Sequence, residues 1–273
     1  MNRSCCYVLG SLMLLTGHCA FAITDSATKE NENKVLQVFI KRQVNQSMSV
    51  GRAVGSITSN YPDEVETIVA TALDLYPDNY QEIIHAAISS QPNATSKIVK
   101  IAMDKEVSSC PNIVELAIQA DPSYVDFVVG AAANSNPDQL KDIVRVAVLT
   151  EPDSADTIVQ TLTAEHPNEL VDILSSAIRA VPLVGEYVVD ALLAVFPGEA
   201  EAVVTTAVRE SGEQREQVRK IIEAAHQAGV DEDSLKRFAI NGGARILTED
   251  NELKTVDVGT PIFLNDEISI TIS

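Results

Sequence analysis

The sequence predicts an all-α protein, an α-solenoid of tandem helices in units of about fifteen residues, followed by a small C-terminal β segment. Three observations carry this prediction. Proline recurs every fifteen residues from Pro62 to Pro197, without insertions or deletions. Two aliphatic residues occupy the seventh and eighth positions of each unit, and alanine usually occupies the eleventh. A repeat this regular indicates an array in which each unit buries its apolar face only against its neighbours.

Ten such units fill residues 62–211. Only one lacks the leading proline: it begins at Val107 and carries Pro111 inside the unit. The aliphatic pair is present in all ten: Ile68-Val69, Ile83-Ile84, Ile98-Val99, Ile113-Val114, Val128-Val129, Ile143-Val144, Ile158-Val159, Ile173-Leu174, Val188-Val189 and Val203-Val204. The pair therefore defines the repeat more strictly than the proline does.

Each unit is predicted to hold one helix of about eleven or twelve residues and a turn of about three. Apolar residues fall at positions four, seven, eight, eleven and twelve, the spacing of one helix stripe. Proline suits the first helical position but breaks a helix interior, so no helix runs through two units. The prolines, the alanines and this spacing disfavour an alternative in which the aliphatic pairs lie in strands. Turns this short predict helical hairpins, so the physical repeat is about thirty residues.

In architecture the array resembles helical-hairpin solenoids such as the tetratricopeptide and HEAT repeats. It lacks the aromatic signature of the former, and its unit is shorter than either, so the residues indicate no particular family. Residues 23–61 are predicted to form an N-terminal helical cap. The expected slots of the repeat phase are occupied by Val50, Ala53, Val54, Ile57 and Thr58, and a further helix is indicated upstream by Val35, Val38 and Phe39.

Beyond the array, residues 212–240 are predicted to form C-terminal capping helices, and residues 241–273 a short β tail. The tail follows the breaker Asn241-Gly242-Gly243 and consists of short apolar runs separated by turns. About thirty residues of sheet cannot form an independent core. The tail is therefore expected to pack on the last helices and close the solenoid, to pair with another chain, which would allow self-association, or to form an incomplete module.

Residues 1–22 have the pattern of a secretory signal: Arg3, an apolar run over 5–17 and the cleavage pattern Ala20-Phe21-Ala22. That run is too short to span a bilayer, and no membrane span is expected elsewhere. The expected location is therefore periplasmic or secreted, in a bacterium. Because the other cysteines lie within 1–22, Cys110 is the one thiol left, and its apolar slot predicts a buried structural role.

The chain has a formal net charge of −19, and residues 62–211 hold 24 acidic against 7 basic side chains. A field of this sign repels phosphate backbones and anionic lipid, so nucleic acid and anionic membranes are poor partners. The acids either solvate the exposed helix faces or attract a basic partner or divalent cations.

The sequence nominates no catalytic, cofactor-binding or metal-binding residue. The histidines beyond the signal are scattered and expected at the surface: His85, His166 and His226. Acids that follow the prolines, such as Asp63 and Asp78, are assigned to helix capping. The leading hypothesis is an exported acidic scaffold that binds a protein or peptide, possibly a basic one. The alternatives are an enzyme or a small-ligand or glycan binder with its site in a groove of the solenoid, and a lipid-surface protein similar to the exchangeable apolipoproteins.

Overall fold

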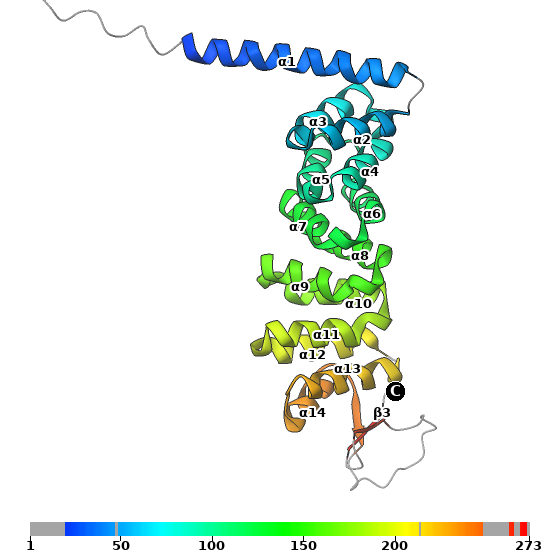
Figure 1. Cartoon of the computed structure of the whole chain (residues 1–273). Helices are drawn as coiled ribbons and strands as arrows, with labels where there is room; N and C mark the ends of the chain where they lie inside the picture. Colours follow the sequence, from blue (N-terminus) through cyan, green and yellow to red (C-terminus); the bar gives the residue numbers. More distant parts are fainter. Residues whose placement is uncertain (1–19, 47–48, 213, 248–261, 265–267, 272–273) are drawn as a thin grey trace, which may run out of the picture.

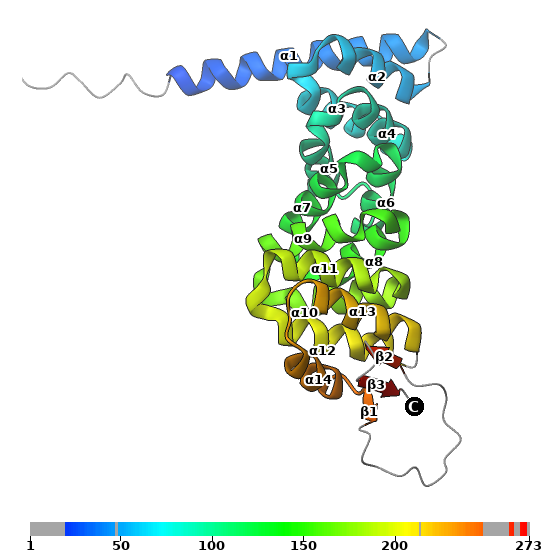
Figure 2. The same cartoon turned by 60° about the horizontal axis from the view of Figure 1, so that its bottom comes forward.

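The computed structural model describes residues 20–46, 49–212, 214–247, 262–264 and 268–271. These residues form an elongated stack of fourteen α-helices packed in tandem (Figures 1 and 2). The predicted all-α, tandem-helix architecture is therefore confirmed. Among the described residues, no helix is both long enough and apolar enough to cross a membrane. The predicted signal at 1–22 lies almost entirely outside the described residues.

The helices are α1 (Ala20–Asn45), α2 (Val50–Asn60), α3 (Val65–Leu75), α4 (Tyr80–Ser90), α5 (Thr95–Asp104), α6 (Cys110–Ala120), α7 (Val125–Ser135), α8 (Leu140–Thr150), α9 (Ala155–Glu165), α10 (Leu170–Ala180), α11 (Gly185–Val195), α12 (Ala200–Ser211), α13 (Arg215–Gln227) and α14 (Glu232–Asn241). Three-residue 3-10 turns precede most array helices: η1 (Pro62–Glu64), η2 (Pro77–Asn79), η3 (Pro92–Ala94), η4 (Pro122–Tyr124), η5 (Pro137–Gln139), η6 (Pro152–Ser154), η7 (Pro167–Glu169), η8 (Pro182–Val184) and η9 (Pro197–Glu199).

Three short strands follow α14: β1 (Arg245–Leu247), β2 (Ile262–Leu264) and β3 (Ile268–Thr271). They pair antiparallel in the order β1-β3-β2. The residues between them lie outside the described part of the chain, so the β tail proposed for 241–273 stays a prediction as a folded unit.

The helices are arranged in two columns. Each helix packs on the helix that follows it and on the next but one, so odd-numbered helices stack in one column and even-numbered helices in the other. Polar contacts within a column join residues 31 positions apart. The Tyr124 hydroxyl, for example, lies 3.0 Å from Oδ1 of Asn93, and the amide of Asn134 donates to Glu165 at 3.1 Å. The physical repeat is thus the predicted thirty-residue helical hairpin.

The core between the two columns is built from the predicted stripe. Every member of the ten aliphatic pairs is at most 1% exposed. The eleventh position is also fully buried in every unit, including the two units with leucine there, Leu162 and Leu192. Burial of about 1.5–3 kcal/mol per large aliphatic side chain, repeated along the column, is the main force that holds the array together.

Each proline that leads a unit begins a 3-10 turn, and the α-helix starts three residues later. Tyr76, which precedes Pro77, has φ −138° and ψ 60°, outside helical geometry. Its N–H closes the preceding helix on the Ala72 carbonyl at 2.9 Å, and its carbonyl accepts the Asn79 N–H at 3.0 Å. The backbone itself therefore satisfies these helix ends.

The acids after the prolines lie in the first turn, as predicted, and they act there without a side-chain cap hydrogen bond. Asp63 and Asp78 are exposed, and η1 and η2 have no side-chain cap hydrogen bond. In η4, by contrast, Asp121 before the proline accepts the Ser123 N–H at 3.1 Å. What remains for Asp63 and Asp78 is the favourable sign of the helix dipole and solvation of the turn.

Helix α5, which precedes the unit without a leading proline, ends differently from the other array helices. Glu106 adopts a left-handed conformation, with φ 49°. The Val107 N–H donates to the Ala102 carbonyl at 3.4 Å and the Glu106 N–H to that of Met103 at 2.9 Å, a Schellman-type ending. The next helix still begins in phase, at Cys110.

Restoring the missing proline is therefore expected to harm the protein. Val107→Pro removes the N–H that bonds to Ala102 and disfavours the left-handed Glu106 before it, so we expect a loss of about 1 kcal/mol or more in urea-induced unfolding. Glu106→Gly is expected to gain about 1 kcal/mol, because glycine adopts this conformation without strain. A stabilised Val107→Pro protein would show that this account of the turn is mistaken.

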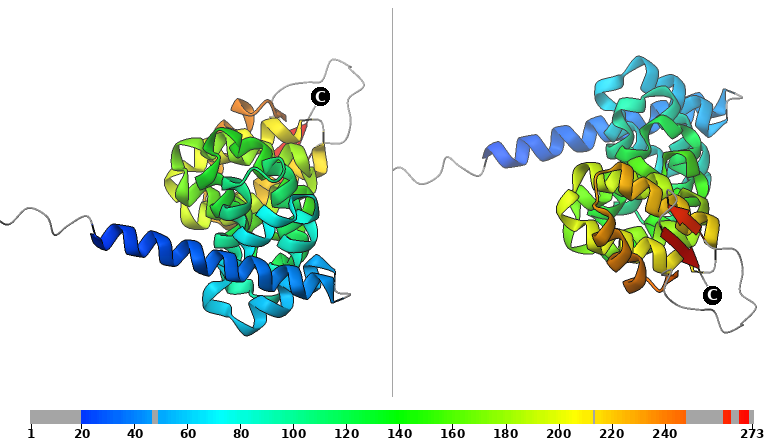
Figure 3. Two further views of the ribbon diagram at one scale, coloured as in Figure 1. Left: turned by 90° about the horizontal axis from the view of Figure 1, so that it is seen from above. Right: turned by 90° about the horizontal axis from the view of Figure 1, so that it is seen from below.

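The first helix is the one indicated upstream of the array, and the structure shows which of its faces packs. α1 exists, but Val35 and Val38 are 70% and 67% exposed, and the residues that pack on the array are Leu36, Ile40 and Val44. The buried face of α1 is thus shifted by one residue from the positions that the repeat phase would bury. No described helix precedes α1, so only one of its sides is covered, and it projects beyond the stack (Figure 3).

Candidate functional site

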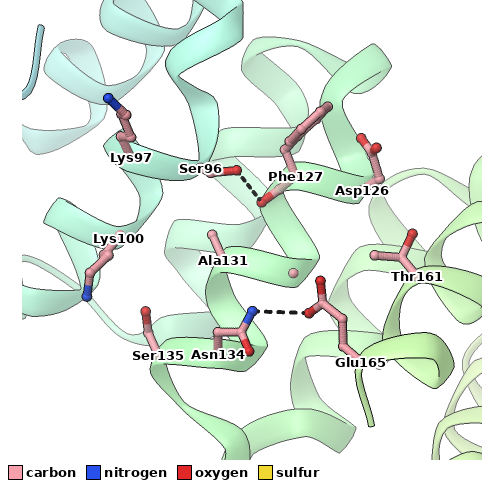
Figure 4. A pocket seen from close by; sticks show the side chains of 11 residues that line it. Ser96, Lys97, Lys100, Asp126, Phe127, Ala131, Asn134, Ser135, Thr161 and Glu165 are labelled. Atoms are coloured by element: carbon pink, nitrogen blue, oxygen red, sulfur yellow. Dashed lines mark hydrogen bonds between the residues drawn. The ribbon is translucent and has the colours of Figure 1, made fainter. Parts of the chain in front are cut away.

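A groove of about 470 Å³ opens across three successive helices of the odd column, α5, α7 and α9 (Figure 4). Every lining residue comes from one of these helices: Ser96, Lys97, Lys100, Asp126, Phe127, Gly130, Ala131, Asn134, Ser135, Thr161 and Glu165. The fifteen-residue repeat positions them, because the same outward-facing positions recur at thirty-residue intervals along the column.

The charges of the groove are divided between its sides. Lys97 and Lys100 lie on α5, whereas Glu165 lies on α9 on the opposite side (Figure 4). The Lys97 ammonium is 2.6 Å from a carboxylate oxygen of Glu66, and that of Lys100 is 3.2 Å from one of Asp104. All four side chains in these two pairs are more than half exposed, so the pairs add little stability and can exchange partners with a bound ligand.

Gly130 on α7 lies at the floor of the groove, and its lack of a side chain determines the shape of the groove there. A β-carbon at this position would lie 3.1 Å from Oε1 of Glu165, so glycine leaves the space in which that carboxylate rests. The Asn134 amide holds the same carboxylate by a hydrogen bond of 3.1 Å. Since Ala131 and Ser135 continue the line of small side chains along α7, a ligand can approach the helix backbone closely here.

Phe127 stands at the mouth of the groove, half exposed. Its ring lies against that of Tyr124, with 5.6 Å between centroids, and the Tyr124 hydroxyl is tied to Asn93. The backbone carbonyl of Phe127 accepts a hydrogen bond from the Ser96 hydroxyl at 3.4 Å, which links α7 to α5. An aromatic ring that is held in place yet open to solvent is a ready contact for an apolar or aromatic side chain.

A second hollow, of about 470 Å³, lies on the even column between α2, α4 and α6 and includes His85. Its edge is set by close helix packing at Gly51. A β-carbon there would lie 2.9 Å from the Glu82 carbonyl oxygen, whereas Gly55 makes only an ordinary contact with Ala86. The Gly51 N–H also donates to Oε2 of Glu82 at 3.2 Å. Glycine at position 51 therefore allows α2 to pack closely on α4.

The strongest electrostatic perturbations lie outside the groove. Cys110 is buried and unpaired, as predicted, and burial, with the nearby charges of Asp142 and Asp138, raises the pKa of its thiol to about 11. Burial alone would raise the pKa of Glu210, but hydrogen bonds from Arg179 and Ser175 outweigh it and hold that pKa below its ordinary value. Cys110 is thus an unreactive structural thiol, and the Arg179–Glu210 pair joins α10 to α12.

The histidines are not brought together. His85 and His226 are exposed, as expected, but His166 is half-buried, and within the described chain its Nε2 is buried without a hydrogen-bond partner. The surface position expected for His166 is therefore wrong. In the described part of the chain, no three His, Cys, Asp or Glu side chains are grouped so that they could hold a metal ion.

Sequence reasoning nominated no site residue and so missed the groove. One signal was present. The sixth position of the units is mostly polar, yet it is aromatic at Phe127 and Tyr187, both in odd-column units. The ninth position is polar in eight of the ten units but glycine at Gly130. On an exposed face that is otherwise polar, these aromatic and glycine positions were the signal that could have indicated a binding surface.

The fold and the groove define the class of this protein as a helical solenoid with an open surface groove. Comparison of the chain with known protein families, with characterised proteins and with solved structures finds no significant match.

Proposed function

We propose that this chain is an exported interaction scaffold that binds an extended peptide segment of a partner protein along the α5–α7–α9 groove. The observation that carries the proposal is Phe127, an anchored and half-exposed ring beside a floor of small side chains. Apolar anchors in such positions supply much of the affinity in peptide recognition. The signal-like pattern of residues 1–22 supports export.

The two sides of the groove favour a peptide with both charges. Lys97 and Lys100 offer ammonium groups to an acidic side chain, and Asp126 and Glu165 offer carboxylates to a basic one. The acidic array around the groove favours an overall basic partner through long-range attraction. Binding should then weaken as salt is raised, because the Debye length shortens.

The proposal is tested by selecting peptides from a random displayed library on the chain from residue 23 onward and measuring their affinity by fluorescence polarisation. We expect Phe127→Ser to weaken binding of the selected peptides about tenfold or more. Leu149→Ser is the matched control, since Leu149 is 51% exposed against 50% for Phe127 but lies on α8 in the other column.

Equal affinity of both variants for the selected peptides would refute the groove as the binding site. If the library yields no binder while a glycan array does, and that binding depends on Phe127, the chain is a small-ligand protein. A hydrolase would in addition have to release product from the bound glycan.

A further inference from the structure

The N-terminal helix carries an apolar stripe that the fold does not use. Val35, Val38 and Phe39 occupy the fourth, seventh and eighth positions of the repeat phase extended backward. Every array helix buries the seventh and eighth positions, and eight of the ten bury the fourth. Here the three residues are 70%, 67% and 36% exposed, because α1 packs through Leu36 and Ile40 instead. These three residues are called the α1 stripe below.

The C-terminal half of α1, which carries the α1 stripe, is basic, and Glu30 and Glu32 lie just before it. Residues 33–61 contain Lys34, Lys41, Arg42 and Arg52 and no acidic residue, whereas residues 62–211 have a large acidic excess. Lys34, Lys41 and Arg42 are exposed on α1 itself. The surface that complements residues 33–45 is therefore both apolar and acidic.

Such a surface exists near the other end of the array. Leu183 in η8 and Tyr187 in α11 are 65% and 62% exposed, and they are one helical turn apart. A hydrogen bond with Glu186 and the negative charges of Glu186 and Asp153 raise the pKa of Tyr187, although Lys220 opposes this. Glu186 is itself paired with Lys220 at 3.2 Å, so the exposed acids are Asp153 in η6 and Asp190, three residues beyond Tyr187 on α11. Together these side chains form what is called the α11 patch: Asp153, Leu183, Glu186, Tyr187 and Asp190.

We propose that the occupant of the α1 stripe is a second copy of this chain, which presents its α11 patch. The contact joins unlike surfaces from opposite ends of the array, with the stripe against Leu183 and Tyr187 and the α1 cations against the acids of the patch. Burial of exposed apolar side chains supplies affinity, and the charges set the partner and the orientation. An anionic lipid surface fits less well, because it would also face the acidic array.

The test is sedimentation velocity of the chain from residue 23 onward over a concentration series at low and at physiological salt. We expect concentration-dependent association that weakens as salt rises. Val35→Ser with Val38→Ser is expected to weaken it about tenfold or more, and Tyr187→Ser to do the same. Val171→Ser is the control, an exposed valine on α10 outside both surfaces. Circular dichroism should show unchanged helix content, because every substituted side chain is exposed.

Mixing the two defective proteins gives the sharpest outcome. Each is expected to self-associate only weakly. The α1 variant keeps an intact α11 patch and the Tyr187 variant keeps an intact stripe, so the mixture should form heterodimers more strongly than either protein associates alone. If the Tyr187 variant associates like the wild type, the contact joins two α1 helices and the proposal fails. A wild-type chain that stays monomeric at low salt also overturns it, as does one that instead floats with phosphatidylglycerol vesicles through the α1 stripe.

Discussion

Replacement of Ile143 by alanine is expected to lower the free energy of unfolding by about 2–5 kcal/mol. Ile143 is fully buried at the seventh position of the α8 unit, between helices of both columns. The substitution removes the transfer free energy of the lost methyl and methylene groups and leaves a cavity that neighbouring helices close only partly. In a tandem array the loss also weakens the interfaces with adjacent units, so its effect on cooperativity extends beyond α8.

The matched control for Ile143 lies on the same helix. Leu149 is 51% exposed, and Leu149→Ala is expected to change stability by no more than about 0.5 kcal/mol. Urea-induced unfolding followed by circular dichroism measures both variants. Similar losses for the two would mean that the seventh position does not face the core, and the assignment of the repeat stripe would have to be abandoned.

Replacement of Gly242 by alanine is expected to loosen the C-terminal cap, at a cost of about 1–3 kcal/mol. A β-carbon at this position would lie 2.7 Å from Cβ of Val208 and 2.9 Å from the Thr205 carbonyl oxygen. Backbone and β-branched atoms of α12 cannot move aside without shifting the helix. Gly242 has φ −77° and ψ −8°, which any residue can adopt, so the requirement for glycine is purely one of space.

Gly198→Ala is the control for Gly242, because a β-carbon at Gly198 would meet no atom within 4 Å. Hydrogen exchange over residues 232–241 should accelerate in the Gly242 variant and stay unchanged in the Gly198 variant. Unchanged exchange in both would show that α14 does not pack on α12 as closely as the distances require.

Much of the fold was predictable because the same pattern of buried positions recurs in all ten units. The aliphatic pairs and the alanines identified the core correctly, and the fifteen-residue unit led to the thirty-residue hairpin. The rest depends on contacts between residues distant in sequence. Gly242 looked like a chain breaker beside Gly243, yet only Gly243 has the positive φ, 100°, of such a role, while Gly242 is a packing position against α12.

The packing face of α1 and the residues of the groove could not be predicted, for a similar reason. Val35, Val38 and Phe39 match the repeat pattern, but at the end of an array one side of a helix is uncovered, and periodicity alone cannot tell which apolar stripe is used. The groove arises where Gly130 of one unit makes room for Glu165 of the next odd-column unit, a match that no single unit displays.

Hydrogen–deuterium exchange with and without a selected peptide tests the central claim, that the solenoid binds its partner across the odd column. We predict slower exchange in three separated stretches, at residues 95–104, 125–135 and 155–165, with α6 and α8 between them unchanged. Protection confined to one continuous stretch, or placed on the even-numbered helices, would contradict the account.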